Sequence, residues 1–273
     1  MNGLAGGRII GLPLRLVTFD RRGHRRLGAL LQGKVIDLPD AVGHPAFPAT
    51  MERLVRSNGG TVLDAARAAL ERDEAEACVV ERPRLLAPLI PTALRAADQS
   101  EGARQVFGPE DEVPWPASAG WLEFHPKIAA VLRRPVDDPL APEEIPNVVF
   151  GYTLVADWLG HGASGDPVPT PEGVPLSIGP CVVTADELDP QTAYVTVRVD
   201  GDEWVKGNLN GTARSLLRDV SFASKDGRLE AGEAFASGPF EIPGFEHRIW
   251  QGARVELEAE GIGVLRNQLG RPR

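Results

Sequence analysis

The chain is poor in aromatic residues and cysteine, and it has no long apolar run. Aromatic residues make up 6% of its 273 positions. No apolar stretch is long enough to cross a bilayer, so we expect a soluble protein without a membrane partner. The two cysteines, Cys78 and Cys181, lie far apart in the sequence, each beside an apolar pair. This pattern predicts buried thiols in a reducing cytoplasm.

Positive charge is also in deficit. The sequence has 38 acidic against 29 basic residues, a net charge of −9 at neutral pH. An excess of negative charge argues against a partner with a phosphate backbone, so we expect no nucleic-acid partner. Residues 1–13 carry Arg8 and a short apolar patch, but they lack the layout of a signal peptide. We predict that these residues form a flexible leader.

Glycine and proline are abundant, at 30 and 24 residues. Together with the few aromatic residues, they predict many turns and a β-rich body. Alternating apolar residues predict a meander of three strands over 14–19, 26–31 and 34–38. Residues 50–55 are expected to form a short helix. Residues 61–72 place their apolar side chains on one face of a longer helix.

The length of the chain fits one large domain and one small domain. We place a small N-terminal α/β domain at residues 14–80 and the main body at residues 81–273. Residues 83–91 contain prolines at a density that favours extended chain over helix, which predicts a hinge between the two.

Charged side chains interrupt two apolar, strand-like runs in the middle of the chain. His125 and Lys127 are two residues apart, so a strand would point both to the same face. Asp157 ends a second apolar run that begins at Val149, and a glycine-rich loop follows it. Charged groups in such runs usually have a partner or a chemical role.

Longer motifs in the same region resemble the fumarylacetoacetate hydrolase superfamily. The resemblance is carried by Gly151-Tyr-Thr-Leu-Val-Ala-Asp157, by Ile178-Gly-Pro-Cys-Val-Val-Thr184, and by the segment from Val255 to Asn267. It implies a mixed α+β, mainly β fold, with a β-sandwich or β-roll body after a small N-terminal domain. It also implies a homodimer that acts on a small anionic or enolisable carbonyl substrate, such as a 2-oxo or 1,3-dicarbonyl acid. The expected reactions are C–C hydrolysis, isomerisation, decarboxylation or cyclisation.

The positions that bind metal in the resembled family are altered here. The family places Glu-x-Glu and an aspartate around a divalent ion, whereas this chain has His125, Lys127 and Asp157. A lysine ammonium has no lone pair to offer, and Mg²⁺ or Ca²⁺ prefers several oxygen ligands. We therefore predict that no metal (Mg²⁺, Ca²⁺ or Mn²⁺) and no other cofactor binds. Glu123 would join such a site only through a register slip of two residues.

Other positions of this chain also differ from the pattern of the resembled family. The resemblance implies a lid with a glutamate, here Glu101, and a water-activating histidine, whose position falls on or near Ala103. The loop after Asp157 lacks the family's basic and acidic residues and instead carries His161, which we expect to be solvated. The resemblance implies that four residues contact the substrate: Tyr152, Thr170, Ser237 and Gly238. Beside them, Pro239 lacks the backbone N–H that the family offers to a substrate carboxylate.

These departures leave two hypotheses open. In the first, the ammonium of Lys127 takes the place of the missing metal cation, Asp157 holds it, and His125 moves protons. The protein would then be an enzyme repurposed for a metal-free reaction, for instance in a specialised biosynthetic pathway. A Schiff base at Lys127 is disfavoured because the adjacent Asp157 would raise its pKa. In the second, the protein is a non-catalytic binding or scaffold protein, and Lys127 and Asp157 form a structural ion pair.

Overall fold

The computed structural model describes residues 13–57, 60–96, 104–168, 174–240 and 248–271. Its larger sheet runs β3-β2-β1-β10-β9-β8-β13-β5, with β14, β4 and β6 paired at its sides. Its strands are β1 (Arg15–Arg21), β2 (His24–Leu31), β3 (Lys34–Asp37), β4 (Leu85–Leu86), β5 (Leu94–Ala96), β6 (Arg104–Phe107), β8 (Trp121–Leu132), β9 (Val149–His161), β10 (Val174–Thr184), β13 (Ala234–Ala236) and β14 (Arg248–Ile249). The predicted mainly β fold is confirmed.

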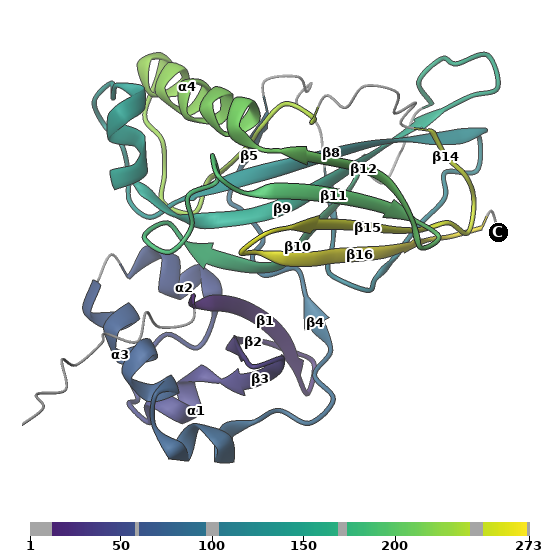
Figure 1. The fold of residues 1–273 in the computed structure, drawn as a ribbon. Coiled ribbons are helices and arrows are strands. Elements are labelled where there is room, and N and C mark those ends of the chain that lie inside the picture. The colour runs from purple at the N-terminus through teal and green to yellow at the C-terminus, as the bar shows by residue number, and fades with distance from the viewer. Residues whose placement is uncertain (1–12, 58–59, 97–103, 169–173, 241–247, 272–273) are drawn as a thin grey trace, which may run out of the picture.

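A smaller sheet packs against the body part of the larger one (Figure 1). It has the order β12-β11-β15-β16-β7. Its strands are β7 (Glu112–Val113), β11 (Tyr194–Val199), β12 (Asp202–Asn208), β15 (Arg254–Ala259) and β16 (Gly263–Leu269). The strong alternation of apolar residues in β11 and β15 explains why one face of this sheet is buried.

Short helices surround the N-terminal meander, and one long helix lies on the body (Figure 1). The helices are α1 (Leu38–Val42), α2 (Met51–Arg56), α3 (Gly60–Leu70), α4 (Asn210–Asp226) and the 3₁₀ helices Asp73–Cys78 and Pro142–Asn147. The three predicted strands and two predicted helices of the N-terminal region are all present. β1 also pairs with β10, so the meander extends the sheet of the body. No helix in the described ranges is long and apolar enough to span a membrane.

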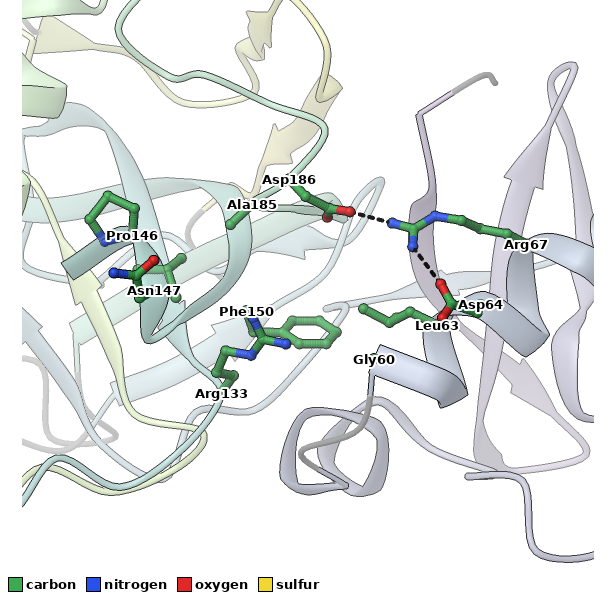
Figure 2. Close-up of a pocket in the computed structure, with 11 residues that line it drawn as sticks. Gly60, Leu63, Asp64, Arg67, Arg133, Pro146, Asn147, Phe150, Ala185 and Asp186 are labelled. Carbon is green, nitrogen blue, oxygen red and sulfur yellow. Dashed lines mark hydrogen bonds and ion pairs between the residues drawn. The ribbon is translucent and has the colours of Figure 1, made fainter. Parts of the chain in front are cut away.

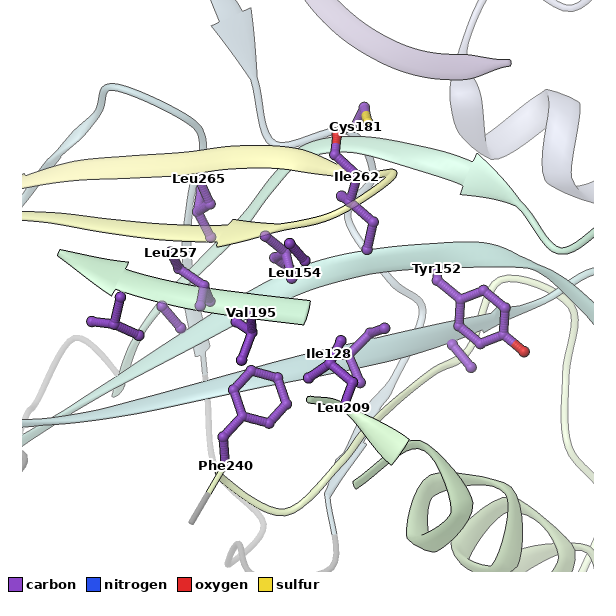
Figure 3. Close-up of a cluster of buried hydrophobic side chains, with 14 of the residues drawn as sticks. Ile128, Tyr152, Leu154, Cys181, Val195, Leu209, Phe240, Leu257, Ile262 and Leu265 are labelled. Carbon is purple, nitrogen blue, oxygen red and sulfur yellow. Dashed lines mark hydrogen bonds between the residues drawn. The ribbon is translucent and has the colours of Figure 1, made fainter. Parts of the chain in front are cut away.

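The two faces of β8 and β9 line different apolar clusters. Ile128 and Leu154 belong to the cluster between the two sheets, where they face Val195 and Leu257 (Figure 3). Val131 and Val155 belong to a second cluster that also includes residues of the N-terminal region. The alternation of side chains along a strand therefore decides which core each residue of β8 and β9 enters.

Gly151, in the motif that carries the family resemblance, is required by close packing between β9 and β10. A Cβ added there would lie 2.2 Å from the backbone oxygen of Val183 and 2.8 Å from Cγ1 of Val182. We expect Gly151→Ala to lower the free energy of unfolding by about 1–3 kcal/mol, because the sheet must shift to make room. Gly207→Ala in β12, where the space around the Cβ is open, is the matched control. Urea unfolding measures both; equal stability of the two variants would contradict the prediction.

Candidate active site

The register between β8 and β9 gathers the polar side chains of the two strands on one face. His125 pairs with Asp157, Lys127 with Val155, and Trp121 with His161. Directly paired residues share a face of an antiparallel sheet, and positions two apart along a strand share it too. Glu123, His125 and Lys127 on β8 therefore point to the same side as Asp157 and His161 on β9.

Lys127 and Asp157 form a buried ion pair at the inner end of this face. The Lys127 Nζ lies 2.8 Å from Asp157 Oδ2, and the side chains are 0% and 1% exposed. The two residues are diagonal across the ladder, a separation that a long lysine side chain spans. The predicted meeting of these two residues is present, but Lys127 does not lie at the surface of an open site.

A carboxylate held between two imidazoles forms the outer part of the face. Glu123 Oε1 lies 2.8 Å from His125 Nε2, and Glu123 Oε2 lies 2.7 Å from His161 Nε2. The three side chains are 28%, 16% and 13% exposed, so this cluster is closer to solvent than the ion pair. Burial acts to raise the pKa of Glu123, but hydrogen bonds and charge from His125 and His161 outweigh it and lower that pKa. Glu123 is therefore ionised at neutral pH.

The expectation that His161 is a solvated loop histidine is wrong. His161 is the last residue of β9, and its ring stacks on Trp121 with the centroids 4.1 Å apart and the planes 5° from parallel. The glycines that follow Asp157 exclude a helix, as expected, but the strand continues for four more residues. Glu123 contacts His125 and His161 from its own position in β8. The spacing by two of Trp121, Glu123, His125 and Lys127 is the signal in the sequence that would have found this face.

Two of the predicted substrate-binding residues, Ser237 and Gly238, follow β13, which pairs with β8. Ser237 follows β13 and is fully buried, and its hydroxyl accepts a hydrogen bond from the backbone N–H of Ile128 at 3.2 Å. The same hydroxyl donates to the carbonyl oxygen of Gly238 at 2.7 Å. These groups are already hydrogen-bonded within the protein, so a role in substrate binding stays a prediction. Two further candidates, Glu101 and Thr170, lie outside the described residues, as does Ala103.

The structure corrects the assignment of Tyr152 as a substrate-binding residue. Tyr152 lies on the opposite face of β9 from Asp157, in the apolar cluster between the sheets (Figure 3). It is 3% exposed, and burial together with the charge of Asp189 raises the pKa of its hydroxyl to about 12. The physical reason is alternation, because five residues separate Tyr152 from Asp157 and an odd spacing puts them on opposite faces.

The residues on this face do not fit the divalent metal that the family resemblance implies. A metal placed beside Asp157 would meet the ammonium of Lys127, which lies 2.8 Å away and has no lone pair to donate. Within the ranges that the structure describes, no three or more His, Cys, Asp or Glu side chains are grouped in a way that would hold a metal. Metal independence remains a prediction for experiment.

A separate cavity of about 450 Å³ lies between α3 and the body (Figure 2). Arg67 crosses this junction and forms ion pairs with Asp186 at 2.8 Å and with Glu187 at 2.9 Å. Arg67 also lies 3.5 Å from Asp64 on its own helix. Among the described residues, His125, Lys127 and Asp157 do not line this cavity. The ion pairs of Arg67 tie α3 to the loop after β10. We therefore regard it as a junction and place the candidate site on β8 and β9.

Comparisons with known proteins agree with the fold and the sequence motifs. The family model described as the C-terminal part of fumarylacetoacetate (FAA) hydrolase matches residues 100–270. A maleylpyruvate hydrolase from Sphingobium sp. SYK-6, solved in complex with manganese(II) and pyruvate, superposes with a TM-score of 0.72 at 22% identity. That similarity covers 95% of this chain and 100% of the hydrolase, and it shows the fold.

Curated relatives have similarly low identity. A mitochondrial oxaloacetate tautomerase of Xenopus laevis, fahd2, is 23% identical over 302 residues, covering 94% of this chain and 90% of the relative. A probable 2-keto-3-deoxyxylonate dehydratase of Haloferax volcanii is 25% identical over 171 residues, which cover 59% of this chain. This chain matches only 55% of the dehydratase's length. At this identity the relatives do not assign a particular reaction to this chain.

Proposed function

Because the chain belongs to the fumarylacetoacetate hydrolase family, we propose that it is an enzyme that enolises a small 2-oxo or 1,3-dicarbonyl acid without a divalent metal. The names of its relatives include a maleylpyruvate hydrolase, oxaloacetate tautomerases and a 2-keto acid dehydratase. These names support a small keto acid as the substrate. Formation of an enolate is the step that C–C hydrolysis, isomerisation, decarboxylation and cyclisation of such acids can share.

The observation that carries the proposal is the Lys127–Asp157 ion pair, 2.8 Å long and shielded from solvent. In the resembled family, a metal ion at these positions supplies the positive charge beside which the enolate oxygen develops. In this chain the ammonium supplies positive charge at the same strand positions. Asp157 balances the charge of Lys127, so the pair attracts an anion only where the anion lies closer to the ammonium than to the carboxylate. In a low-dielectric interior that local attraction is stronger than it is in water.

His125 is the side chain placed to move the proton. It lies directly opposite Asp157 across the two strands. Its Nε2 is hydrogen-bonded to Glu123, so the proton would be taken by Nδ1, which is buried and must be uncovered when a substrate binds. An imidazole changes its protonation state near neutral pH and is the commonest general acid or base in enzymes. In the proposed step, His125 takes a proton from the carbon next to the carbonyl group. The electron pair of that C–H bond becomes the enolate, and the protonated imidazole can return the proton to either end.

The proposal is tested with protein dialysed against EDTA and then assayed for the keto–enol conversion of oxaloacetate and related 2-oxo acids. We expect activity to change by less than about twofold on adding Mg²⁺ or Mn²⁺, and Lys127→Met to lower it by about 100-fold or more. Lys34→Met, at an exposed lysine, is the control. Activity that needs added metal would contradict the proposal, and so would full activity of Lys127→Met.

The complete burial of Lys127 favours a second candidate function, that of a non-catalytic binding or scaffold protein. On that reading the ion pair fills a closed pocket and has no substrate. Replacing a buried pair by apolar residues of similar volume is often neutral or stabilising. If Lys127→Met/Asp157→Leu melts at a higher temperature and binds oxaloacetate as the wild type does, the pair is structural. The homodimer expected of the family is a further proposal, which light scattering in solution tests.

A further inference from the structure

We infer that Glu123, His125 and His161 form the proton-transfer centre of the site, with Glu123 shared between two imidazoles of different charge. This inference rests on the proposed function, because it names the groups that carry out its proton step. The family resemblance places the usual water-activating histidine at or near residue 103, which is alanine here. The cluster on β8 and β9 supplies two histidines and a carboxylate on the face that also holds Lys127 and Asp157.

The hydrogen bonds of His161 assign its charge. Its Nε2 lies 2.7 Å from the carboxylate of Glu123, and its Nδ1 lies 3.0 Å from the carbonyl oxygen of Gly165. An ionised carboxylate and a carbonyl oxygen only accept hydrogen bonds, so both ring nitrogens of His161 must donate. His161 is therefore the imidazolium form. The parallel Trp121 ring, 4.1 Å away, is a surface on which a flat cation is favourable.

The positive charge of His161 determines the net charge that surrounds His125. Glu123 carries one negative charge and His161 one positive charge, so the pair is neutral before His125 takes up a proton. The Nε2 of His125 donates to the other carboxylate oxygen of Glu123 at 2.8 Å, which fixes the orientation of the ring. When His125 becomes charged, Glu123 stabilises it at once, because a charge-assisted hydrogen bond is stronger than a neutral one.

Two neighbouring features also act on these charges: the Lys127–Asp157 pair, and Arg248, which adds a positive charge. Lys127 and Asp157 neutralise each other at 2.8 Å. Arg248 on β14 pairs with Glu123 in the sheet register, and its guanidinium lies 4.6 Å from the centre of the Trp121 ring. His125 is therefore the catalytic residue of the inference, whereas Glu123 and His161 are positioning residues that act through it. His161 prevents the carboxylate from holding His125 permanently in the charged form.

The charge assignment is tested on the wild-type protein by ¹⁵N NMR of the histidine rings at pH 7.5, with His161→Gln used to identify the signal. We expect the ¹⁵N signals of His161 to show a proton on both ring nitrogens, because both nitrogens face hydrogen-bond acceptors. A neutral His161 would overturn the inference. This measurement does not depend on whether any variant folds.

The proton-transfer role is tested by the exchange of the C3 protons of pyruvate in D₂O, followed by ¹H NMR. We expect His125→Gln to slow exchange by about 100-fold or more, Glu123→Gln by about 30-fold and His161→Gln by about 10-fold, with KM changed by less than about twofold. Glu123→Gln should also move the low-pH limb of the rate profile to lower pH, because the protonated form of His125 loses its partner. His24→Gln, at an exposed histidine of β2, should exchange as the wild type does.

The outcomes separate the inference from the proposed function. If the wild type exchanges no proton of pyruvate or oxaloacetate, the proposed function fails and the inference fails with it. If the wild type exchanges protons and Glu123→Gln and His161→Gln keep its rate and pH profile, the inference is overturned while the function stands. Stoichiometric zinc that is lost in Glu123→Gln would also overturn it, since the three groups would then be metal ligands.

Discussion

Replacing Lys127 by alanine is expected to lower the free energy of unfolding by about 3–5 kcal/mol, in addition to removing activity. Both side chains of the Lys127–Asp157 pair are almost completely buried. Removing one partner leaves a carboxylate in the interior without its counter-charge, which is far more costly than losing an ion pair at the surface. For a chain of this size, the loss corresponds to a melting temperature lower by about 10 °C.

The size of this effect is measured by urea unfolding, followed by tryptophan fluorescence, of three variants. Lys34→Ala removes an exposed lysine whose ion pair with Glu76 is 3.4 Å long, and it should cost less than about 1 kcal/mol. Lys127→Met/Asp157→Leu should restore most of the stability lost in Lys127→Ala. A cost for Lys127→Ala as small as that for Lys34→Ala would show that Asp157 is not held in a closed interior.

The shared face of His125 and Lys127 could be predicted from the sequence, because a spacing of two within a strand fixes it. The partner of Lys127 could be proposed only through the resemblance to a family. The same alternation argues against Tyr152 as a companion of Asp157, since five residues separate them within one apolar run. Local periodicity alone is therefore sufficient to separate Tyr152 from Asp157.

The outer cluster could not be predicted from local pattern alone. Whether His161 meets Glu123 depends on the pairing of Trp121 with His161, which is set by the whole length of β8 and β9. The same is true of the burial of Lys127. Residues more than a hundred positions away contact β8 there, with the backbone N–H of Ser237 bonded to the carbonyl oxygen of Ile128 and that of Phe240 bonded to the carbonyl oxygen of Pro126. Long-range packing of this kind leaves no periodic signal in the sequence.

Placing the family's carboxylates at positions 125 and 127 should create a metal site that the native residues do not fit. In His125→Glu/Lys127→Glu, two new carboxylates would face Asp157, since His125 is directly opposite it and Lys127 Nζ lies 2.8 Å from it. Three buried carboxylates repel one another, so we expect the metal-free variant to melt about 10 °C or more below the wild type. Mn²⁺ accepts oxygen ligands of this kind and would remove the repulsion.

Thermal unfolding with and without 1 mM Mn²⁺ measures this effect. An ion present at about 1,000 times its Kd stabilises the folded state by about 4 kcal/mol, which corresponds to roughly 8–16 °C here. The wild type should shift by less than about 1 °C, because its ammonium occupies the place of the ion. Adding Asp157→Asn to the double variant should remove most of the response, since one of three carboxylates is lost.

A response of the wild type as large as that of the double variant would mean that the native face binds the metal despite Lys127. No response in the double variant would mean that β8 and β9 do not hold the three positions close enough to share one ion.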